Sequence, residues 1–149
     1  MGTIVRAPAG APDAGPCLFL AGGISGCPDW QGPLGEQLAA GLPGWTILDP
    51  RRELPPEDDA AVAAQVAWEH RHLRRSTAVL FWFPPETLCP ITLYELGAMS
   101  MTTRPLFVGV DPGYARRRDV LLQTGLARPD VEPVGSLAAL AAQVLARCR

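Results

Sequence analysis

Residues 78–101 read AVLFWFPPETLCPITLYELGAMSM and contain the clearest strand of the chain, followed closely by a helix. The first six residues of this stretch are all apolar, and three of them are aromatic, a composition typical of a strand that is buried on both faces. Pro84 and Pro85 end the strand, and the apolar residues that follow predict a helix over 91–101. The stretch therefore predicts a strand at the centre of a parallel sheet.

The segments on either side repeat this alternation of strand and helix. Strands are expected at 17–21, 45–48, 105–110 and 131–134, and helices at 31–40, 60–75 and 115–125. A final helix, capped by Ser136, is expected to run to about Arg147. Strands that alternate with helices imply a parallel, doubly wound sheet with right-handed crossovers. We therefore expect a flavodoxin-like α/β fold of five strands in the order 2-1-3-4-5, in which the strand at 17–21 is the first.

The length and composition of the chain indicate one domain. A chain of 149 residues that is 48% hydrophobic fits a single globular unit with its own core. The first 16 residues are rich in proline, glycine and alanine and have no sustained periodicity, so we expect residues 1–16 to be a mobile tail and residues 17–149 to be the domain.

The same composition excludes several classes of function. A net charge of −2 provides no basic field to hold a phosphate backbone, so nucleic acid is not expected as a partner. No apolar stretch approaches the roughly 20 residues needed to cross a bilayer, and no export sequence is visible, so a cytoplasmic location is expected. We expect neither a metal nor a cofactor, since the four cysteines form no CxxC pair; these are Cys17, Cys27, Cys89 and Cys148.

One carboxylate, Glu95, interrupts the otherwise uncharged run 91–101. Burying a lone carboxylate costs several kcal/mol unless the group is hydrogen-bonded or paired, so nucleophilic or acid/base chemistry is one interpretation. The other interpretation is structural, because a partly exposed glutamate in the first turn is favoured by the helix dipole.

The loop at 21–31, AGGISGCPDWQ, follows the first strand and lies at the same crevice of the predicted sheet as Glu95. Its glycines, among them Gly22 and Gly23, let backbone N–H groups approach a ligand, although glycine pairs after strands are also ordinary turns. Trp30 could stack on a planar base or pack in the core, and the Asp29 carboxylate could bind the edge of that base. The loop lacks the GxGxxG pattern, so a dinucleotide site is not favoured.

Taken in order, several segments resemble the nucleoside 2-deoxyribosyltransferase family, in the branch with the GCPDWQ and ETLCPITLYELGA signatures. They are FLAGGISGCPDWQ (19–31), LDPRR (48–52), WEHRHLRRSTAVLFWFP (68–84), LYELGAMS (93–100) and PLFVGV (105–110). The resemblance implies that Glu95 attacks the anomeric carbon of a deoxynucleoside and forms a covalent glycosyl-enzyme. A second base or water then takes the sugar with net retention, as in a retaining glycosidase.

The resemblance also implies the other residues of the site. Asp29 is the preferred acid for the departing base, with Asp49 as the alternative. The expected substrate contacts are Gly22, Gly23, Ile24, Trp30, Asp49, Arg51, His72 and Cys89. Three positions depart from the family pattern, because Phe19, His72 and Cys89 stand where members often carry a tyrosine and two aspartates.

Several alternatives remain open from the sequence. Arg51 and Arg52 could bind a 5′-phosphate or be solvated loop residues. The protein could transfer the sugar to a base, hydrolyse the glycosidic bond, or bind a nucleotide-type ligand without turning it over. The expected partner is a small-molecule nucleoside or nucleotide. A homo-oligomer is also expected, with the apolar surface at 96–101 either at a subunit interface or packed on the chain's own sheet.

Overall fold

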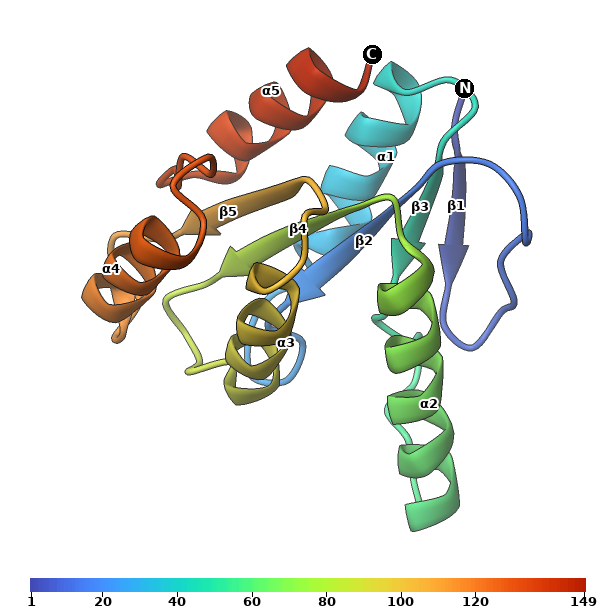
Figure 1. Cartoon of the computed structure of the whole chain (residues 1–149). Coiled ribbons are helices and arrows are strands. Elements are labelled where there is room, and N and C mark those ends of the chain that lie inside the picture. Colours follow the sequence, from blue (N-terminus) through green and yellow to red (C-terminus); the bar gives the residue numbers. More distant parts are fainter.

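A five-stranded parallel sheet forms the centre of the computed structural model, which describes residues 1–149 (Figure 1). The strands are β1 (Thr3–Arg6), β2 (Cys17–Gly22), β3 (Thr46–Asp49), β4 (Ala78–Phe83) and β5 (Leu106–Val110). Their order in the sheet is β1-β3-β2-β4-β5, and every neighbouring pair is parallel. The predicted flavodoxin-like α/β fold is confirmed.

Strand β4 lies between β2 and β5, and all six of its residues are buried. Phe81 pairs in register with Ala21 of β2 and Val108 of β5. A strand covered on both faces loses nothing by being apolar at every position. This is why the run AVLFWF predicts its place in the fold so well.

The two ends of the sheet differ from the expectation. Strand β1 comes from the segment expected to be a mobile tail, and Val5 pairs with Leu48 of β3, so the tail prediction is wrong for this part of the chain. The expected strand at 131–134 contributes only a bridge between Val134 and Gly109. Pro133 has no N–H group to donate to a ladder, which limits this segment to a short contact.

Five helices cover the sheet, and they divide between its two faces (Figure 1). They are α1 (Gln31–Gly41), α2 (Asp59–Arg75), α3 (Pro90–Ser100), α4 (Arg117–Ala127) and α5 (Leu137–Cys148). Helices α1 and α5 pack on one face through residues such as Leu38 and Leu140. Helices α2, α3 and α4 pack on the other face, where Trp68, Leu96 and Val120 belong to a second core cluster. None of the helices combines the length and the apolar composition needed to cross a membrane.

Local signals explain where several helices begin. Ser136 caps α5 as the sequence predicts, since its hydroxyl accepts a hydrogen bond from the N–H of Ala139 at 3.1 Å. Asp58 caps α2 in the same way. Helix α3 begins differently: Cys89 has a left-handed backbone, with φ of 50°, and Pro90 follows at the first helical position. A positive φ at a non-glycine residue is uncommon and often occurs at functional sites.

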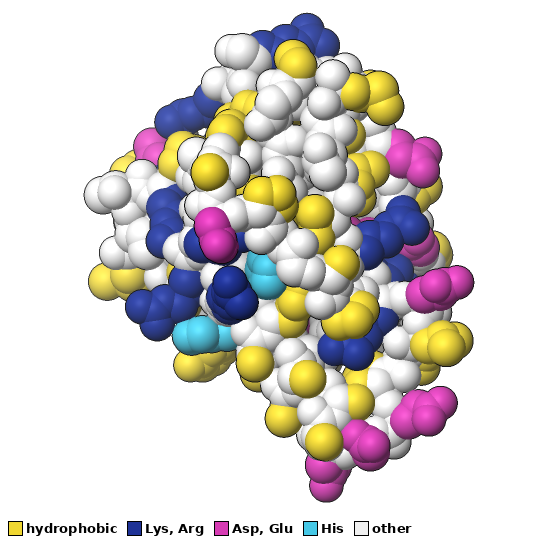
Figure 2. Space-filling view, turned by 90° about the vertical axis from the view of Figure 1, so that its right-hand side faces the viewer, with side chains coloured by type: hydrophobic (Ala, Val, Ile, Leu, Met, Phe, Trp, Pro, Cys, Tyr) yellow, Lys and Arg dark blue, Asp and Glu magenta, His cyan; other side chains and the backbone are white.

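The N-terminal half of α2 extends beyond the sheet (Figure 1). Figure 2 shows hydrophobic side chains along this lower, projecting part and acidic side chains near its tip. Val62 and Val66 are among the exposed hydrophobic residues of the helix. The C-terminal half of α2 instead packs on the sheet through Trp68 and Leu73.

Candidate active site

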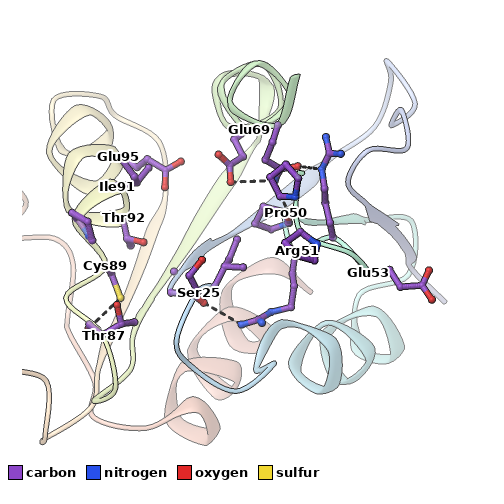
Figure 3. A pocket seen from close by; sticks show the side chains of 18 residues that line it. Ser25, Pro50, Arg51, Glu53, Glu69, Thr87, Cys89, Ile91, Thr92 and Glu95 are labelled. Atoms are coloured by element: carbon purple, nitrogen blue, oxygen red, sulfur yellow. Dashed lines mark hydrogen bonds between the residues drawn. The ribbon is translucent and has the colours of Figure 1, made fainter. Parts of the chain in front are cut away.

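A cavity of about 570 Å³ lies at the carboxyl ends of β2 and β3, between α2 and α3 (Figure 3). Four segments line it: residues 22–25 at the end of β2 and just after it, parts of the loop 50–56 after β3, residues of the stretch 87–95 just before and in α3, and the side chains of Gln65 and Glu69 from α2. This is where a doubly wound sheet binds ligands, since the loops that follow neighbouring strands separate there. The volume is that of a typical small-molecule site.

The structure places Glu95 in this cavity, in the crevice where the sequence predicts it. The residue is half-buried, and its carboxylate extends from α3 into the open space (Figure 3). Burial and, secondarily, the charge of Glu69 raise the pKa of Glu95 to about 8. A carboxyl group perturbed in this way within a cavity is a candidate for chemistry.

Glu69 is the acidic residue that the sequence analysis missed. It comes from α2, and Figure 3 shows its carboxylate pointing toward that of Glu95. Burial raises the pKa of Glu69, while a hydrogen bond from Gln65 and the charge of Arg52 act in the opposite direction. In the sequence, Glu69 stands in the charged segment EHRHLRR and gives no sign that it is directed inward.

Gln65 connects Glu69 to the loop after β3. Its Nε2 donates to the carbonyl of Pro50 at 2.8 Å and to Oε1 of Glu69 at 3.3 Å. Its Oε1 accepts a hydrogen bond from Nε of Arg52. The carboxamide therefore has a defined orientation, with its N–H groups toward the carboxylate and its oxygen toward the guanidinium.

Gly22, Gly23 and Ile24 line the cavity, as expected. A Cβ atom added at Gly22 would lie 2.3 Å from Cζ2 of Trp30 and 2.5 Å from the carbonyl oxygen of Trp82. Glycine is therefore required at this position by close packing.

Trp30 does not line the cavity. The residue is 6% exposed and belongs to the core on the α1 side of the sheet. Its Nε1 donates to the carbonyl of Gly23 at 2.9 Å, which ties the loop to the core. Of the two interpretations of this side chain, packing is the one that the structure supports, and the expectation of stacking on a base is corrected.

Arg51 borders the cavity, but its guanidinium mainly holds the loop after β2. Its Nε donates to Oε1 of Gln31 at 3.0 Å, and its Nη2 donates to the carbonyl of Pro28 at 3.0 Å. The Nε of Arg52 donates a hydrogen bond to Oε1 of Gln65. These contacts make both arginines part of the walls of the site.

Asp29 and Asp49 lie outside this cavity, along a neighbouring cleft of about 790 Å³. The Asp29 carboxylate accepts a hydrogen bond from the N–H of Gly32 at 2.9 Å at the start of α1 and lies 3.4 Å from Nε of Arg51. Asp49 is 2% exposed and lies 3.3 Å from Nε of Arg6. Burial raises the pKa of Asp49. The expectation that Asp29 or Asp49 acts beside Glu95 is corrected, because both carboxylates have structural partners elsewhere.

His72 is a core residue and contacts no part of the cavity. It is 2% exposed, stacks on Trp68 with ring centroids 4.1 Å apart, and has Nδ1 2.7 Å from the carbonyl of Trp68. Burial lowers the pKa of His72. The expected contact of His72 with substrate is therefore corrected. Glu69, three residues earlier on the same helix, is the side chain that enters the cavity.

Cys89 does line the cavity, as expected. It is buried, and its Sγ donates to the carbonyl of Thr87 at 3.5 Å. Burial raises the pKa of Cys89 to about 11, so the thiol is neutral at physiological pH. Thr92, one turn into α3, is a second lining residue that the sequence analysis missed.

No group of three or more His, Cys, Asp or Glu side chains is arranged to hold a metal ion. The chemical groups of the cavity include two facing carboxylates, a buried threonine, a neutral thiol and the backbone of a glycine-rich loop.

Comparison with known proteins identifies the family to which the chain belongs. No curated relative matches the chain. Residues 15–114 match the family model described as nucleoside 2-deoxyribosyltransferase like, which spans most of the chain, and the protein therefore belongs to that family.

Proposed function

We propose that the protein cleaves or exchanges the N-glycosidic bond of a nucleoside or nucleotide, with Glu95 as the nucleophile. The observation that carries the proposal is the pair of facing carboxylates, Glu95 and Glu69, in a cavity of about 570 Å³. The family to which the chain belongs supports a nucleoside-type ligand.

In the first step, a carboxylate oxygen of Glu95 bonds to the anomeric carbon as the bond from that carbon to the base nitrogen breaks. The bonding electrons leave with the base, and Glu69 donates a proton to it, because an unprotonated base is a poor leaving group. The product is a neutral base and a glycosyl ester of Glu95. Water or a second base then attacks the same carbon and gives up a proton to the Glu69 carboxylate, while the bond to Glu95 breaks and Glu95 leaves as a carboxylate; two displacements give net retention.

The two carboxylates suit this division of work because they cannot easily be ionised together. Like charges at close range push two pKa values apart, and a pair of this kind titrates as one unit. The pair then holds one proton around neutral pH. The reactive arrangement has that proton on Glu69 and leaves Glu95 ionised.

Glu69 takes the acid role that the sequence analysis assigned to Asp29. Glu69 shares the cavity with Glu95, whereas Asp29 is engaged at the start of α1. The hydrogen bond from Gln65 orients Glu69 Oε1 and leaves Oε2 as the oxygen available to the base. The position of Glu69 in the same cavity as Glu95, and not its charge alone, therefore favours Glu69 as the acid that protonates the base.

The test is release of base from deoxynucleosides and deoxynucleotides, with and without an acceptor base. Wild type is compared with Glu95→Gln, and the control is Glu36→Gln, which changes an exposed glutamate on α1, across the sheet. Glu95-dependent release, together with a sugar adduct on Glu95 by intact mass, supports the proposal. Equal release by wild type and Glu95→Gln would contradict it.

A second candidate is a module that binds a nucleotide-type ligand without turning it over. It is favoured by one observation: Trp30 and His72, two of the expected substrate contacts, are core residues. A binding module would retain affinity for the ligand, form no covalent adduct, and bind equally well when Glu95 is replaced by glutamine.

We also propose that a second copy of the chain packs beside the cavity. The projecting half of α2, residues 60–67, carries no charged side chain, and Val66 is 57% exposed. On α3, Tyr94 is 78% exposed, whereas Leu96 and Met99 are buried in the chain's own core. The exposed apolar residues of α2 and α3 are thus the better candidates for an interface than the whole of 96–101.

The oligomeric state tests this part of the proposal. Light scattering of wild type at working concentration is expected to give a dimer or a larger assembly. Val66→Glu places a charge on the projecting helix and is expected to shift the protein toward monomer, while the same change at Leu126, exposed on α4, leaves the mass unchanged. A monomeric wild type would contradict the proposal.

A further inference from the structure

We propose that the substrate carries a phosphate on the 5′ position of its sugar and that the first turn of α3, with the side chain of Thr92, holds this phosphate. The inference rests on the proposed function and narrows its substrate to a nucleoside monophosphate. Two independent observations carry it: an unused hydroxyl and a set of unused backbone donors.

The first observation is the side chain of Thr92. The residue is only 3% exposed, and it lines the cavity. Figure 3 shows its oxygen directed into the cavity from α3. Its hydroxyl makes no hydrogen bond within the chain, whereas the buried hydroxyls of Ser76 and Tyr114 each donate to a backbone carbonyl. A nearly buried, unpartnered hydroxyl that opens only into a cavity is a donor available to a ligand.

The second observation is the start of α3, a helix of 11 residues. Its first backbone hydrogen bond runs from the N–H of Leu93 to the carbonyl of Cys89, at 3.0 Å. The N–H groups of Ile91 and Thr92 precede it and have no acceptor in the chain. Such free N–H groups, together with the positive end of the helix dipole, bind phosphate in many proteins.

The surroundings of this turn contain neutral and acidic side chains. The other labelled side chains at this end of the cavity are Ser25, Thr87 and Cys89, of which two are hydroxyl residues and the third is a neutral thiol (Figure 3). Glu95 lies beside Ile91 and Thr92 on the same helix, and Glu69 faces it from α2. Two carboxylates border this turn, Glu95 one turn along α3 and Glu86, whose charge contributes to raising the pKa of Cys89, so a phosphate here would be held by hydrogen bonds from the turn and not by a cationic side chain.

The spacing along α3 fits one nucleotide. Thr92 and Glu95 are three residues apart, so they lie on the same side of the helix, separated by a rise of about 4.5 Å. A sugar whose anomeric carbon meets Glu95 would extend its 5′ substituent along the helix toward Thr92. One ligand can therefore contact both residues at once.

The donor set also distinguishes phosphate from a free hydroxyl. The N–H groups of Ile91 and Thr92 and the Thr92 hydroxyl belong to residues that line the cavity, and all three can donate. A phosphate offers an acceptor to each donor, whereas a 5′-hydroxyl has only two lone pairs. The arginine pair, the alternative that the sequence suggested for phosphate, is engaged in holding the walls of the site.

The test compares a 2′-deoxynucleoside 5′-monophosphate with its parent nucleoside. Wild type is expected to have a kcat/KM at least tenfold higher for the monophosphate, the factor typical of hydrogen bonds to a charged group. Thr92→Val, which removes only the hydroxyl, is expected to reduce that preference by about tenfold. Thr124→Val makes the same change on α4, at a buried hydroxyl without a partner, and should leave the preference as in wild type.

Direct binding decides the inference even when no base is released. In calorimetry, the monophosphate and inorganic phosphate are each expected to bind the wild-type protein more tightly than they bind the Thr92→Val variant. Equal affinity of wild type for nucleoside and monophosphate, with no effect of Thr92→Val, would overturn the phosphate site. That result is distinct from failure of the proposed function, which would appear as base release that does not depend on Glu95.

Discussion

Glu69 on α2 and Glu95 on α3 direct their carboxylates toward each other across one cavity (Figure 3). Two half-buried acids in this arrangement cannot both be ionised without cost. Burial and the charge of Glu69 accordingly raise the pKa of Glu95 to about 8. This pairing leads to the first three predictions below.

Replacing Glu69 by glutamine should slow the release of an ordinary nucleobase by about 10² to 10⁴, the range for loss of an acid/base group. The same variant should retain most of its activity on a glycoside with a leaving group that needs no proton, such as nitrophenolate. Steady-state rates on the two substrates measure the effect. An equal loss on both would indicate that Glu69 acts on the fold or on binding and not as the acid.

The pH dependence of kcat/KM should reflect the raised pKa of Glu95. On the activated substrate, whose leaving group needs no proton, only ionisation of Glu95 limits the rate, so the rate in wild type should rise with pH toward about 8. In Glu69→Gln the like charge is removed, so the pKa of Glu95 falls and the rise moves to lower pH. The activated substrate allows both proteins to be followed, and an unchanged profile would contradict electrostatic coupling of the pair.

Stability should also depend on Glu95, with a definite sign. The folded protein holds a proton on Glu95 up to about pH 8, whereas the unfolded chain loses it near 4.5, so the free energy of unfolding decreases as the pH rises through this window. Glu95→Gln carries no such charge and should be more stable than wild type at pH 8, with the difference vanishing near pH 4. Urea unfolding at both pH values measures this, and a difference that grows toward low pH would contradict it.

Gln65 should act as a positioning residue for Glu69. Gln65→Leu removes the hydrogen bond to Glu69 Oε1 and the contact with Pro50, which should reduce kcat/KM by roughly fivefold to tenfold, as expected for loss of one hydrogen bond. It should also raise the pKa of Glu69, since the bond favours the ionised form. The matched control is Gln37→Leu on the exposed side of α1. A pH profile identical to that of wild type would argue against positioning.

Glycine at position 22 should be required for stability. An added Cβ would meet Trp30 at 2.3 Å and the backbone of Trp82 at 2.5 Å, so Gly22→Ala should lower the free energy of unfolding by about 1–3 kcal/mol. Gly125→Ala is the control, because that position on α4 has open space around it and alanine favours a helix by about 1 kcal/mol. Thermal unfolding should therefore move in opposite directions for the two variants.

The sequence predicts the helices and strands that have local signals, and it misses a strand whose pairing depends on residues far along the chain. β4 and α5 were predicted from local signals, a fully apolar run and the Ser136 cap. β1 was missed because Ile4 and Val5 are its only large apolar residues, in a segment rich in proline and glycine. The partner of this strand is β3, far along the chain, so no local pattern records the pairing.

The candidate site likewise contains residues that the sequence predicted and residues that it missed. Glu95, Gly22 and Gly23 were predicted because the ends of neighbouring parallel strands must meet at one edge, whereas Ile24 and Cys89 were implied by the resemblance to the family. Trp30 was placed at the site by its position on the loop after β2, and His72 by the resemblance to the family, yet both side chains pack in the core. Glu69 was missed because helical periodicity alone does not show which side of α2 faces the cavity.

By itself, the sequence determined the α/β class, the order of the four strands from β2 to β5, the family and the position of the acidic residue on α3, since these follow from local composition and chain order. Only the tertiary structure decided which second carboxylate faces Glu95, that β1 completes the sheet, and that Thr92 has unused donors. These features depend on the packing of α2 and α3 against one sheet, and side-chain direction is set by that packing and not by residue type.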